Sequence, residues 1–524
     1  MKILSFKPGH DGSVALVEDG QLVFSLESEK DSFPRYANVT PSTIVEAAAS
    51  MGGPPDVVCI SGWVKGFHSV DRPLGAGYFS WDEASCLVRD DHFFGYTVRT
   101  FSSTHERSHL LSAYGMSEIP QGQPCYALVW EGNIGSFYEI TSDVKIRRIT
   151  AVMEDPGNKY QHIFALADPT TSPEQSGFRF SNAGKLMALT GFARPGVASQ
   201  AERELIDFIL DQPSILLTTP KDKLAWSPFH NIGVESQEFK NLAAKLSQAI
   251  FDRFYTVAVR ELTEGYPLLI AGGCGLNCDW NSQWRASGLF ESVFVPPCTN
   301  DTGSALGTAI DAQRHFTGDA KITWSVYSGS SFVHDCEASG TFESMEFDLA
   351  HAARLLADGR ILAWVQGRCE IGPRALGNRS LLAAPFDPAM RDRLNEIKVR
   401  EPYRPIAPVC LEEDVSEHFD WNGPCPYMLY FQKVHNTRLG AVTHVDGSAR
   451  VQTVSKTDNS QLHALLCEFK KITGIGVLCN TSLNFPGRGF INRTSDLIEY
   501  VGDWKLDGFV LDDRLYIPGR VGAS

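Results

Sequence analysis

Residues 366–408 read QGRCEIGPRALGNRSLLAAPFDPAMRDRLNEIKVREPYRPIAP and decide how the rest of the chain is interpreted. This segment carries eight basic and five acidic residues, although the whole protein has a formal net charge of -15. Several arginines stand beside glycine or proline, where the backbone turns, as in Gly367-Arg368, Pro373-Arg374 and Arg404-Pro405. An arginine on a turn presents a rigid fork of donors to a phosphate or carboxylate. The segment therefore predicts an anion site, although its basic residues also balance carboxylates elsewhere.

Length and composition indicate a soluble protein of two or three domains. A chain of 524 residues exceeds one ordinary core, and 43% hydrophobic and 21% charged residues are typical of globular proteins. No apolar run approaches the ~20 residues that span a bilayer, and the N-terminus lacks signal-peptide features. Twelve cysteines without a C-x-x-C pair favour reduced thiols and a cytoplasmic location. The acidic net charge argues against a nucleic-acid partner.

The N-terminus predicts three strands, at residues 2–6, 13–17 and 21–27, with Asp19-Gly20 as a tight turn between the last two. The first connection, residues 7–12, reads KPGHDG. Its two glycines allow the backbone to approach a ligand and aim His10 and Asp11 at it. A plain hairpin loop with exposed polar side chains explains the same residues equally well.

A strand, a glycine-bounded acidic loop and a returning strand recur at residues 126–140. Such a repeat is typical of duplicated actin- or sugar-kinase-like halves, which clamp a nucleotide between them. Residues 317–348 are rich in glycine and serine and lose apolar periodicity, which predicts a linker before a second domain.

Between the two copies, residues 103–111 predict a helix that Ser103 or Thr104 caps. Helical spacing places His105 and His109 one turn apart on the same face, a geometry that is able to hold one metal ion. Taken alone, the pair is more simply interpreted as two surface histidines.

Glycine-rich turns further along the chain suggest nucleotide contacts. Gly184-Lys185 lies at a predicted helix start without Walker spacing, and a strand at residues 267–271 opens into GGCGLNC. Bare backbone amides in such turns can approach a phosphate or ribose, although a close-packed strand–helix crossing needs the same glycines. Asp301 stands at the mouth of a later small-residue helix, residues 303–309.

The motifs GRCEIGPRALGNRSLLA and IKVREPYRPIAP resemble the signature of the O-carbamoyltransferases, a family that includes nodulation-factor, tobramycin and cephalosporin carbamoylation enzymes. The similarity runs nearly end to end. It implies an α/β fold with a duplicated actin/sugar-kinase-like domain at residues 1–335 and a YrdC-like α/β domain at residues 345–524. It also implies that carbamoyl phosphate and ATP, the latter with Mg²⁺, form carbamoyl adenylate. The carbamoyl group then passes to a hydroxyl of a small molecule.

The resemblance implies roles for individual residues. His10 and Asp11 would be catalytic, and an iron- or manganese-like divalent ion would bind His105, His109, Glu131 and Asp301. Glu131 is a departure, because many members have aspartate in that loop. The implied nucleotide contacts are Gly184, Lys185, Gly272, Gly273, Asn277 and Asp301. The implied contacts to carbamoyl phosphate or ATP are Arg368, Arg374, Arg379, Lys398, Arg400, Arg404, His444, Arg450, Asn480 and Ser482.

Other functions stay open on the sequence alone. A sugar-kinase-like phosphotransferase explains the N-terminal repeat but leaves the arginine segment without a role. A tRNA threonylcarbamoyl-type enzyme shares both domain types, yet a net charge of -15 disfavours tRNA docking. A binding module without activity has little need of the His10, His105, His109 and Asp301 set.

The acceptor alcohol is predicted by resemblance alone. The motifs FKPGHDG and SLESEKDSFPRY are more similar to the branch that acts on 3′-hydroxymethylcephem than to the nodulation or aminoglycoside branches. Macrolide and polyketide alcohols stay open as acceptors. The oligomeric state is not determined by the sequence.

Overall fold

The computed structural model describes residues 1–66, 72–172, 179–338 and 342–518. The N-terminal sheet has the strand order β3-β2-β1-β4-β8-β7, in which β1 to β3 are antiparallel and β4 and β8 run parallel to β1. Asp19 and Gly20 both have positive φ, as a tight turn between β2 and β3 requires. The three predicted N-terminal strands are confirmed. The strands of this sheet are β1 (Lys2–Lys7), β2 (Ser13–Glu18), β3 (Gln21–Glu27), β4 (Val57–Ile60), β7 (Leu87–Phe93) and β8 (Tyr96–Ser102).

A second sheet repeats this topology in the order β11-β10-β9-β12-β13. Strands β9, β10 and β11 are again antiparallel, and β12 and β13 again run parallel to β9. The predicted duplication of an actin/sugar-kinase-like half is therefore confirmed by strand order and direction. The strands are β9 (Cys125–Trp130), β10 (Gly135–Ile140), β11 (Ile146–Ala151), β12 (Leu268–Ala271) and β13 (Val293–Phe294).

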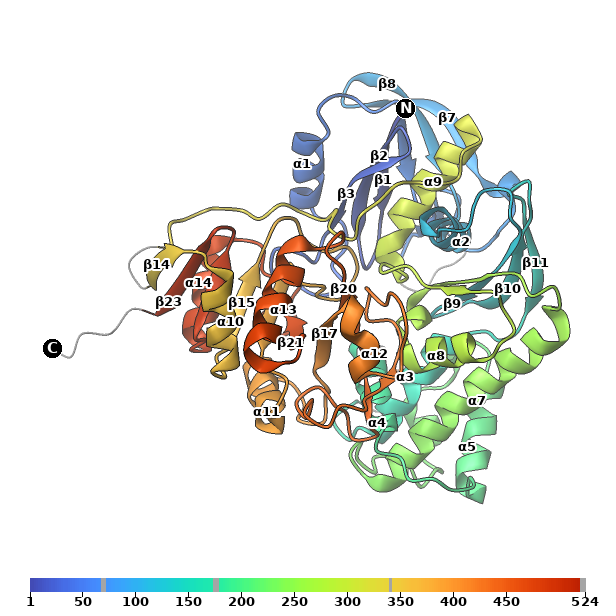
Figure 1. The fold of residues 1–524 in the computed structure, drawn as a ribbon. Helices are drawn as coiled ribbons and strands as arrows, with labels where there is room; N and C mark the ends of the chain where they lie inside the picture. Colours follow the sequence, from blue (N-terminus) through green and yellow to red (C-terminus); the bar gives the residue numbers. More distant parts are fainter. Residues whose placement is uncertain (67–71, 173–178, 339–341, 519–524) are drawn as a thin grey trace.

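Helices α2 (His105–Met116) and α9 (Ser304–Thr317) lie between these two sheets (Figure 1). Both helices share one buried cluster with side chains of β1, β4, β9 and β12. Gly307 of α9 allows the two helices to touch, because a Cβ there would come within 1.7 Å of the carbonyl oxygen of Ser108. This contact fixes the position of α2, and with it the histidine pair. Helix α1 (Pro41–Ser50) covers the opposite face of the N-terminal sheet.

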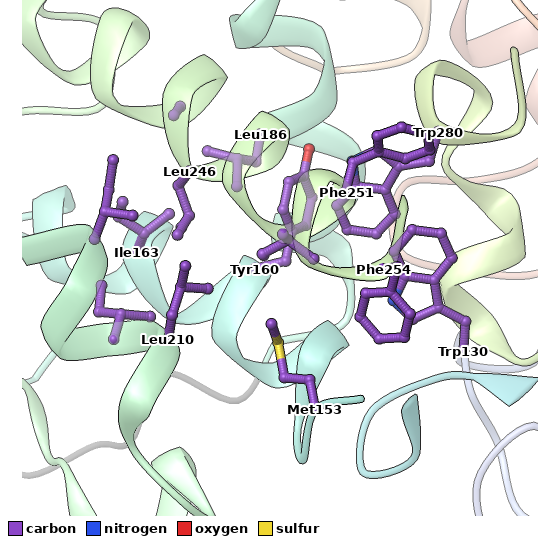
Figure 2. Packing of buried hydrophobic residues seen from close by; sticks show 14 of the residues in the cluster. Trp130, Met153, Tyr160, Ile163, Leu186, Leu210, Leu246, Phe251, Phe254 and Trp280 are labelled. Carbon is purple, nitrogen blue, oxygen red and sulfur yellow. The ribbon is translucent and has the colours of Figure 1, made fainter. Parts of the chain in front are cut away.

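A separate helical layer packs on the other face of the second sheet. Figure 2 shows its aromatic centre, where the ring of Trp130 stacks on that of Trp280 at 4.5 Å and contacts Phe254. The helices of this layer are α3 (Pro156–Ala167), α4 (Ser181–Thr190), α5 (Gln200–Asp211), α6 (Ile215–Thr218), α7 (Gln237–Glu261) and α8 (Cys278–Ala286). Of these, α4, α7 and α8 form one wall of the arginine cavity that is described below.

The C-terminal part contains an eight-stranded mixed sheet in the order β14-β23-β22-β15-β16-β21-β17-β20. Helices α10 (Leu349–Ala357) and α13 (Ser460–Thr473) cover one face, and α11 (Pro388–Ile397) and α14 (Thr494–Asp503) pack on the other. The chain is thus α/β in all parts. The strands are β14 (Phe342–Glu346), β15 (Leu362–Val365), β16 (Arg379–Ala383), β17 (Ala407–Leu411), β20 (Gln452–Val454), β21 (Val477–Ser482), β22 (Gly508–Leu511) and β23 (Arg514–Pro518).

The segment predicted as a linker is attached to both parts. Thr323 forms a bridge with Gln21 of β3, and Val333 forms one with Arg493 at the start of α14. The sheet begins with β14 at Phe342, so the expected start of the second domain at residue 345 falls within a strand. Among the helices of the described residues, none is long and apolar enough to cross a membrane.

Candidate active site

The loop after β1 carries His10 and Asp11. Gly9 has a φ of +80°, and a Cβ at this position would lie 2.5 Å from Nε1 of Trp63, so only glycine fits beneath this ring. Nδ1 of His10 lies 2.8 Å from Oδ2 of Asp11, whose other oxygen accepts from the side chain of Asn300. If Nδ1 carries the proton, the carboxylate fixes the tautomer and Nε2 is left as a proton acceptor.

His105, His109, Glu131 and Asp301 converge, although they come from α2, the loop after β9 and the 3-10 turn (Asp301–Gly303) that precedes α9. The two Nε2 atoms lie 3.2 Å apart, and Oδ1 of Asp301 lies 3.6 Å from that of His105 and 3.3 Å from that of His109. One donor atom from each residue lies within 4.8 Å of all the others. These separations suit an ion with ligand bonds of about 2 Å.

The charge states of this cluster also fit a metal ion. Burial lowers the pKa of His105 to about 3, so its imidazole is neutral and able to bind a cation. Burial opposes the charge of Asp301, but the ammonium group of Lys7 and a hydrogen bond from His109 help to hold its pKa well below the ordinary value. Burial and the neighbouring Asp301 raise the pKa of Glu131 to about 6. A divalent cation would relieve the repulsion between these two carboxylates.

Two residues that the sequence interpretation missed support the cluster. The ammonium group of Lys7 lies 3.3 Å from Oδ2 of Asp301, and it donates to the carbonyl oxygens of Pro8 and His10. The hydroxyl of Tyr78 lies 3.0 Å from both carboxylate oxygens of Glu131, and its ring packs on His105. Lys7 stood within the quoted loop and could have been found there. No feature of the sequence pointed to Tyr78, because it is distant in sequence from every motif.

The arginine segment lines a cavity of about 240 Å³ that lies against α4, α7 and α8. The Nε atoms of Arg374 and Arg450 are buried and have no hydrogen-bond partner among the described residues. Burial and the neighbouring Arg450 lower the pKa of Arg374 to about 9, and burial with Arg404 does the same for Arg400. An anion would relieve this mutual repulsion. The predicted residues that line the cavity are Gly184, Arg374, Arg400, Arg404, His444 and Arg450.

Two arginines predicted for the anion site have structural contacts. All five N–H groups of Arg379 donate within the protein, to the side chain of Asn492 and to carbonyl oxygens of residues 366, 367 and 378. Arg368 donates to the carbonyl oxygens of Val23, Ser328 and Gly329, and so ties the C-terminal sheet to the N-terminal part. Neither side chain lines the cavity. That the two side chains bind phosphate stays a prediction, although each N–H group of Arg379 already donates within the protein and each nitrogen of Arg368 donates to a backbone oxygen.

The remaining predicted phosphate contacts lie outside the cavity lining. Lys398 donates to Ser482 and Asn484, and Ser482 in turn donates to the side chain of Asn484. Asn480 donates to Ala375 and Gln452, behind the loop that carries Arg374. Burial lowers the pKa of Lys398 well below its ordinary value. These residues hold β21 against the arginine segment.

Only some of the predicted nucleotide residues lie where a ligand could contact them. Gly184 lines the cavity, whereas Lys185 pairs with Glu401 at 2.7 Å at a partly exposed position. Gly272 has a φ of +94°, and a Cβ there would lie 2.6 Å from the carbonyl oxygen of Trp130, so this glycine serves close packing. The neighbouring Gly273 has open space at its Cβ position, and Asn277 caps α8 by accepting from residues 279 and 280. Within the predicted turn, Gly273 is therefore the residue with open space beside its backbone.

Comparison with known proteins identifies the family of this chain. The family model for the carbamoyltransferase N-terminus matches residues 96–310, and that for the carbamoyltransferase C-terminus matches residues 353–517. A 3′-hydroxymethylcephem-O-carbamoyltransferase of Streptomyces clavuligerus is 51% identical over 98% of this chain and 99% of its own length. The protein of the same name from Amycolatopsis lactamdurans is also 51% identical over the same shares.

A more distant relative is nodulation protein U of Rhizobium tropici, which is 35% identical over 95% of this chain and 94% of its own length. Solved structures resemble the chain weakly, as for HypF, with 14% identity, 61% of this chain and 47% of that chain covered, and a TM-score of 0.31. The fold description therefore rests on the strand order given above. The matched regions and full-length relatives show that this chain belongs to the carbamoyltransferases, a family of enzymes.

Proposed function

We propose that the protein is an O-carbamoyltransferase that forms carbamoyl adenylate in the arginine cavity and transfers its carbamoyl group to an alcohol beside His10. One observation carries the proposal. A single chain holds both a cavity with four half-buried arginines and a separate buried histidine–carboxylate cluster. A phosphotransferase of the kinase type gives no role to the second of these sites once the first is occupied by nucleotide.

The first half-reaction requires a strongly electropositive site. Carbamoyl phosphate is hydrolysed to carbamate and inorganic phosphate. An oxygen of the carbamate then attacks the α-phosphorus of ATP and expels pyrophosphate. These reactants are anions, so their approach is favoured by fixed positive charge. Arg374, Arg400, Arg404 and Arg450 would contact phosphoryl oxygens, and Mg²⁺ would accompany ATP. Gly184, Gly273 and His444 are the proposed contacts to the remainder of the nucleotide.

The second half-reaction requires a base and a polarised carbonyl. Nε2 of His10 would accept the proton of the acceptor hydroxyl while Asp11 holds the other ring nitrogen. The hydroxyl oxygen then attacks the carbamoyl carbon, and the bond to the AMP oxygen breaks. His105, His109, Asp301 and Glu131 would hold a divalent ion, for which we propose Fe²⁺ or Mn²⁺ and which would polarise the carbonyl.

For the acceptor we propose 3′-hydroxymethylcephem, which places the protein in antibiotic biosynthesis. Both full-length relatives at 51% identity carry this substrate in their names. We further propose two functional units, a transfer domain at residues 1–335 and a YrdC-like adenylate-forming domain at residues 345–524. The proposed location is the cytoplasm, and the acidic net charge supports a small-molecule acceptor and no nucleic-acid partner.

The test measures pyrophosphate and product in the same reaction. Purified protein is given ATP with and without carbamoyl phosphate, and then 3′-hydroxymethylcephem or a panel of macrolide and polyketide alcohols. We expect pyrophosphate release only with carbamoyl phosphate, and a mass gain of one carbamoyl group on the cephem. Pyrophosphate release that does not depend on carbamoyl phosphate would contradict the adenylate step. A mass gain on another alcohol alone would reassign the acceptor.

A further inference from the structure

Residues 31–38 form a segment that lies between the N-terminal and C-terminal parts. Asp31, Ser32 and Tyr36 all have positive φ, between 60° and 63°, which non-glycine residues adopt only when their surroundings hold them there. Backbone bonds supply that hold, since Ser32 N–H donates to Phe490 and Arg35 N–H donates to Gly487, both at 3.0 Å. The segment is thus fixed against the C-terminal part, with Tyr36 at a defined position.

Tyr36 connects the two proposed reaction sites through one aromatic neighbour. Its ring centroid lies 4.8 Å from that of Phe180, which lies 4.6 Å from the imidazole of His10. Burial raises the pKa of Tyr36, and the nearby Arg35 and Arg374 oppose this rise. The charges that act on its phenol include Arg374 and Arg404 of the cavity. The carbonyl of Tyr36 also accepts from Asp11 N–H, so the ring pair stands beside the proposed base.

Helix α4 gives the distance between the two sites. Phe180 immediately precedes α4 in helical conformation, and Gly184 follows one turn later on the same face. A Cβ at Gly184 would lie 3.9 Å from Nη2 of Arg404, so this turn faces the arginine cavity. Four residues of helix rise about 6 Å, and the contacts to His10 and to Arg404 are therefore about one helical turn apart along α4.

From this placement we propose that the ring pair Tyr36–Phe180 is the barrier between the two sites, which the carbamoyl adenylate passes and which keeps water from it. The inference rests on the proposed function. Without the barrier, water oxygen attacks the carbamoyl carbon, the bond to the AMP oxygen breaks, and AMP leaves. The carbamic acid so formed decomposes to carbon dioxide and ammonia. The loss then appears as pyrophosphate released without carbamoylated product.

The test is the ratio of pyrophosphate to carbamoylated product at saturating acceptor. The wild-type ratio is expected to be near one, and Tyr36→Ala and Phe180→Ala are expected to raise it severalfold while pyrophosphate release continues. Tyr36→Phe and Phe180→Leu, which keep apolar bulk, should raise it less and replace the alanine variants if those do not fold. Tyr96→Ala and Phe94→Ala are matched controls, because both rings are exposed on the β7–β8 hairpin.

The outcomes separate the two proposals. A wild-type protein without carbamoyl-phosphate-dependent pyrophosphate release contradicts the proposed function itself. If the wild type is coupled and the folded variants at Tyr36 and Phe180 keep the same ratio, the barrier is overturned and the proposed function stands. An equal rise in the two hairpin controls would also overturn it, because uncoupling would then not depend on the position of the rings.

Discussion

The ammonium group of Lys7 lies 3.3 Å from Oδ2 of Asp301, and Lys7 has no solvent-exposed side-chain surface. The same group lies 3.6 Å from the centre of the Trp63 ring. Lys7 therefore links the loop that carries His10 to a carboxylate of the candidate metal cluster. A buried cation in this position keeps Asp301 ionised and holds the His10 backbone in place.

Lys7→Met should leave the Asp301 carboxylate buried without its partner. Removal of one member of a buried ion pair costs about 3 kcal/mol or more, and we expect this loss in urea unfolding of chelator-treated protein. Carbamoyl transfer should fall as well. Lys2→Met on the same strand is the control, because Lys2 pairs with the partly exposed Glu18. Unchanged stability and transfer in the Lys7 variant would remove Lys7 from the site.

His105→Ala combined with His109→Ala should abolish metal binding, because both Nε2 atoms point into the cluster. Elemental analysis of protein purified without chelator is expected to show about one metal ion per wild-type chain and none in the variant. His92→Ala on the edge strand β7 should keep the wild-type content. The site would be wrong if the double variant kept both its metal and its transfer rate.

His10→Asn should separate the two half-reactions. Asparagine keeps size and polarity but cannot accept the hydroxyl proton, so carbamoylated product should disappear while pyrophosphate release continues. Arg404→Ala should suppress both signals, since without the adenylate nothing is transferred. Equal loss of pyrophosphate release in the two variants would make His10 a structural or nucleotide-site residue.

Arg404→Lys should weaken the use of carbamoyl phosphate, because a lysine cannot reproduce two parallel hydrogen bonds to a phosphate. The expected result is a higher KM for carbamoyl phosphate or ATP with unchanged circular dichroism. Arg393→Lys is the matched control, since Arg393 pairs with Asp507 at an exposed position outside the cavity. Wild-type kinetics in the Arg404 variant would exclude this residue from the phosphate site.

Arg379→Ala should act on stability, because five hydrogen bonds of a buried guanidinium are lost together. Several unsatisfied acceptors, such as Asn492 and the carbonyl of Gly367, would remain buried. We expect the free energy of unfolding to fall by about 3 kcal/mol or more. A stable variant with impaired carbamoyl phosphate use would assign Arg379 to the anion site.

Local sequence patterns predicted the parts of this fold that depend on short-range rules. Alternation and the Asp19-Gly20 turn predicted β1 to β3, and the repeated strand–loop–strand pattern predicted the duplicated halves. The spacing of His105 and His109 placed both on one face of α2, because helical periodicity is fixed by the backbone. The convergence of Glu131 and Asp301 on this pair came from family resemblance and could not be derived from spacing.

Only the tertiary structure decided which arginines are free for a ligand. Arg374 and Arg379 stand five positions apart in the same motif and look alike in sequence. Arg379 finds its acceptor in Asn492, 113 residues away, whereas Nε of Arg374 finds none among the described residues. The sequence by itself determined the density of positive charge and the turns that carry it. Long-range packing decided where that charge is satisfied, because a hydrogen bond depends on which distant acceptors the fold brings within about 3 Å.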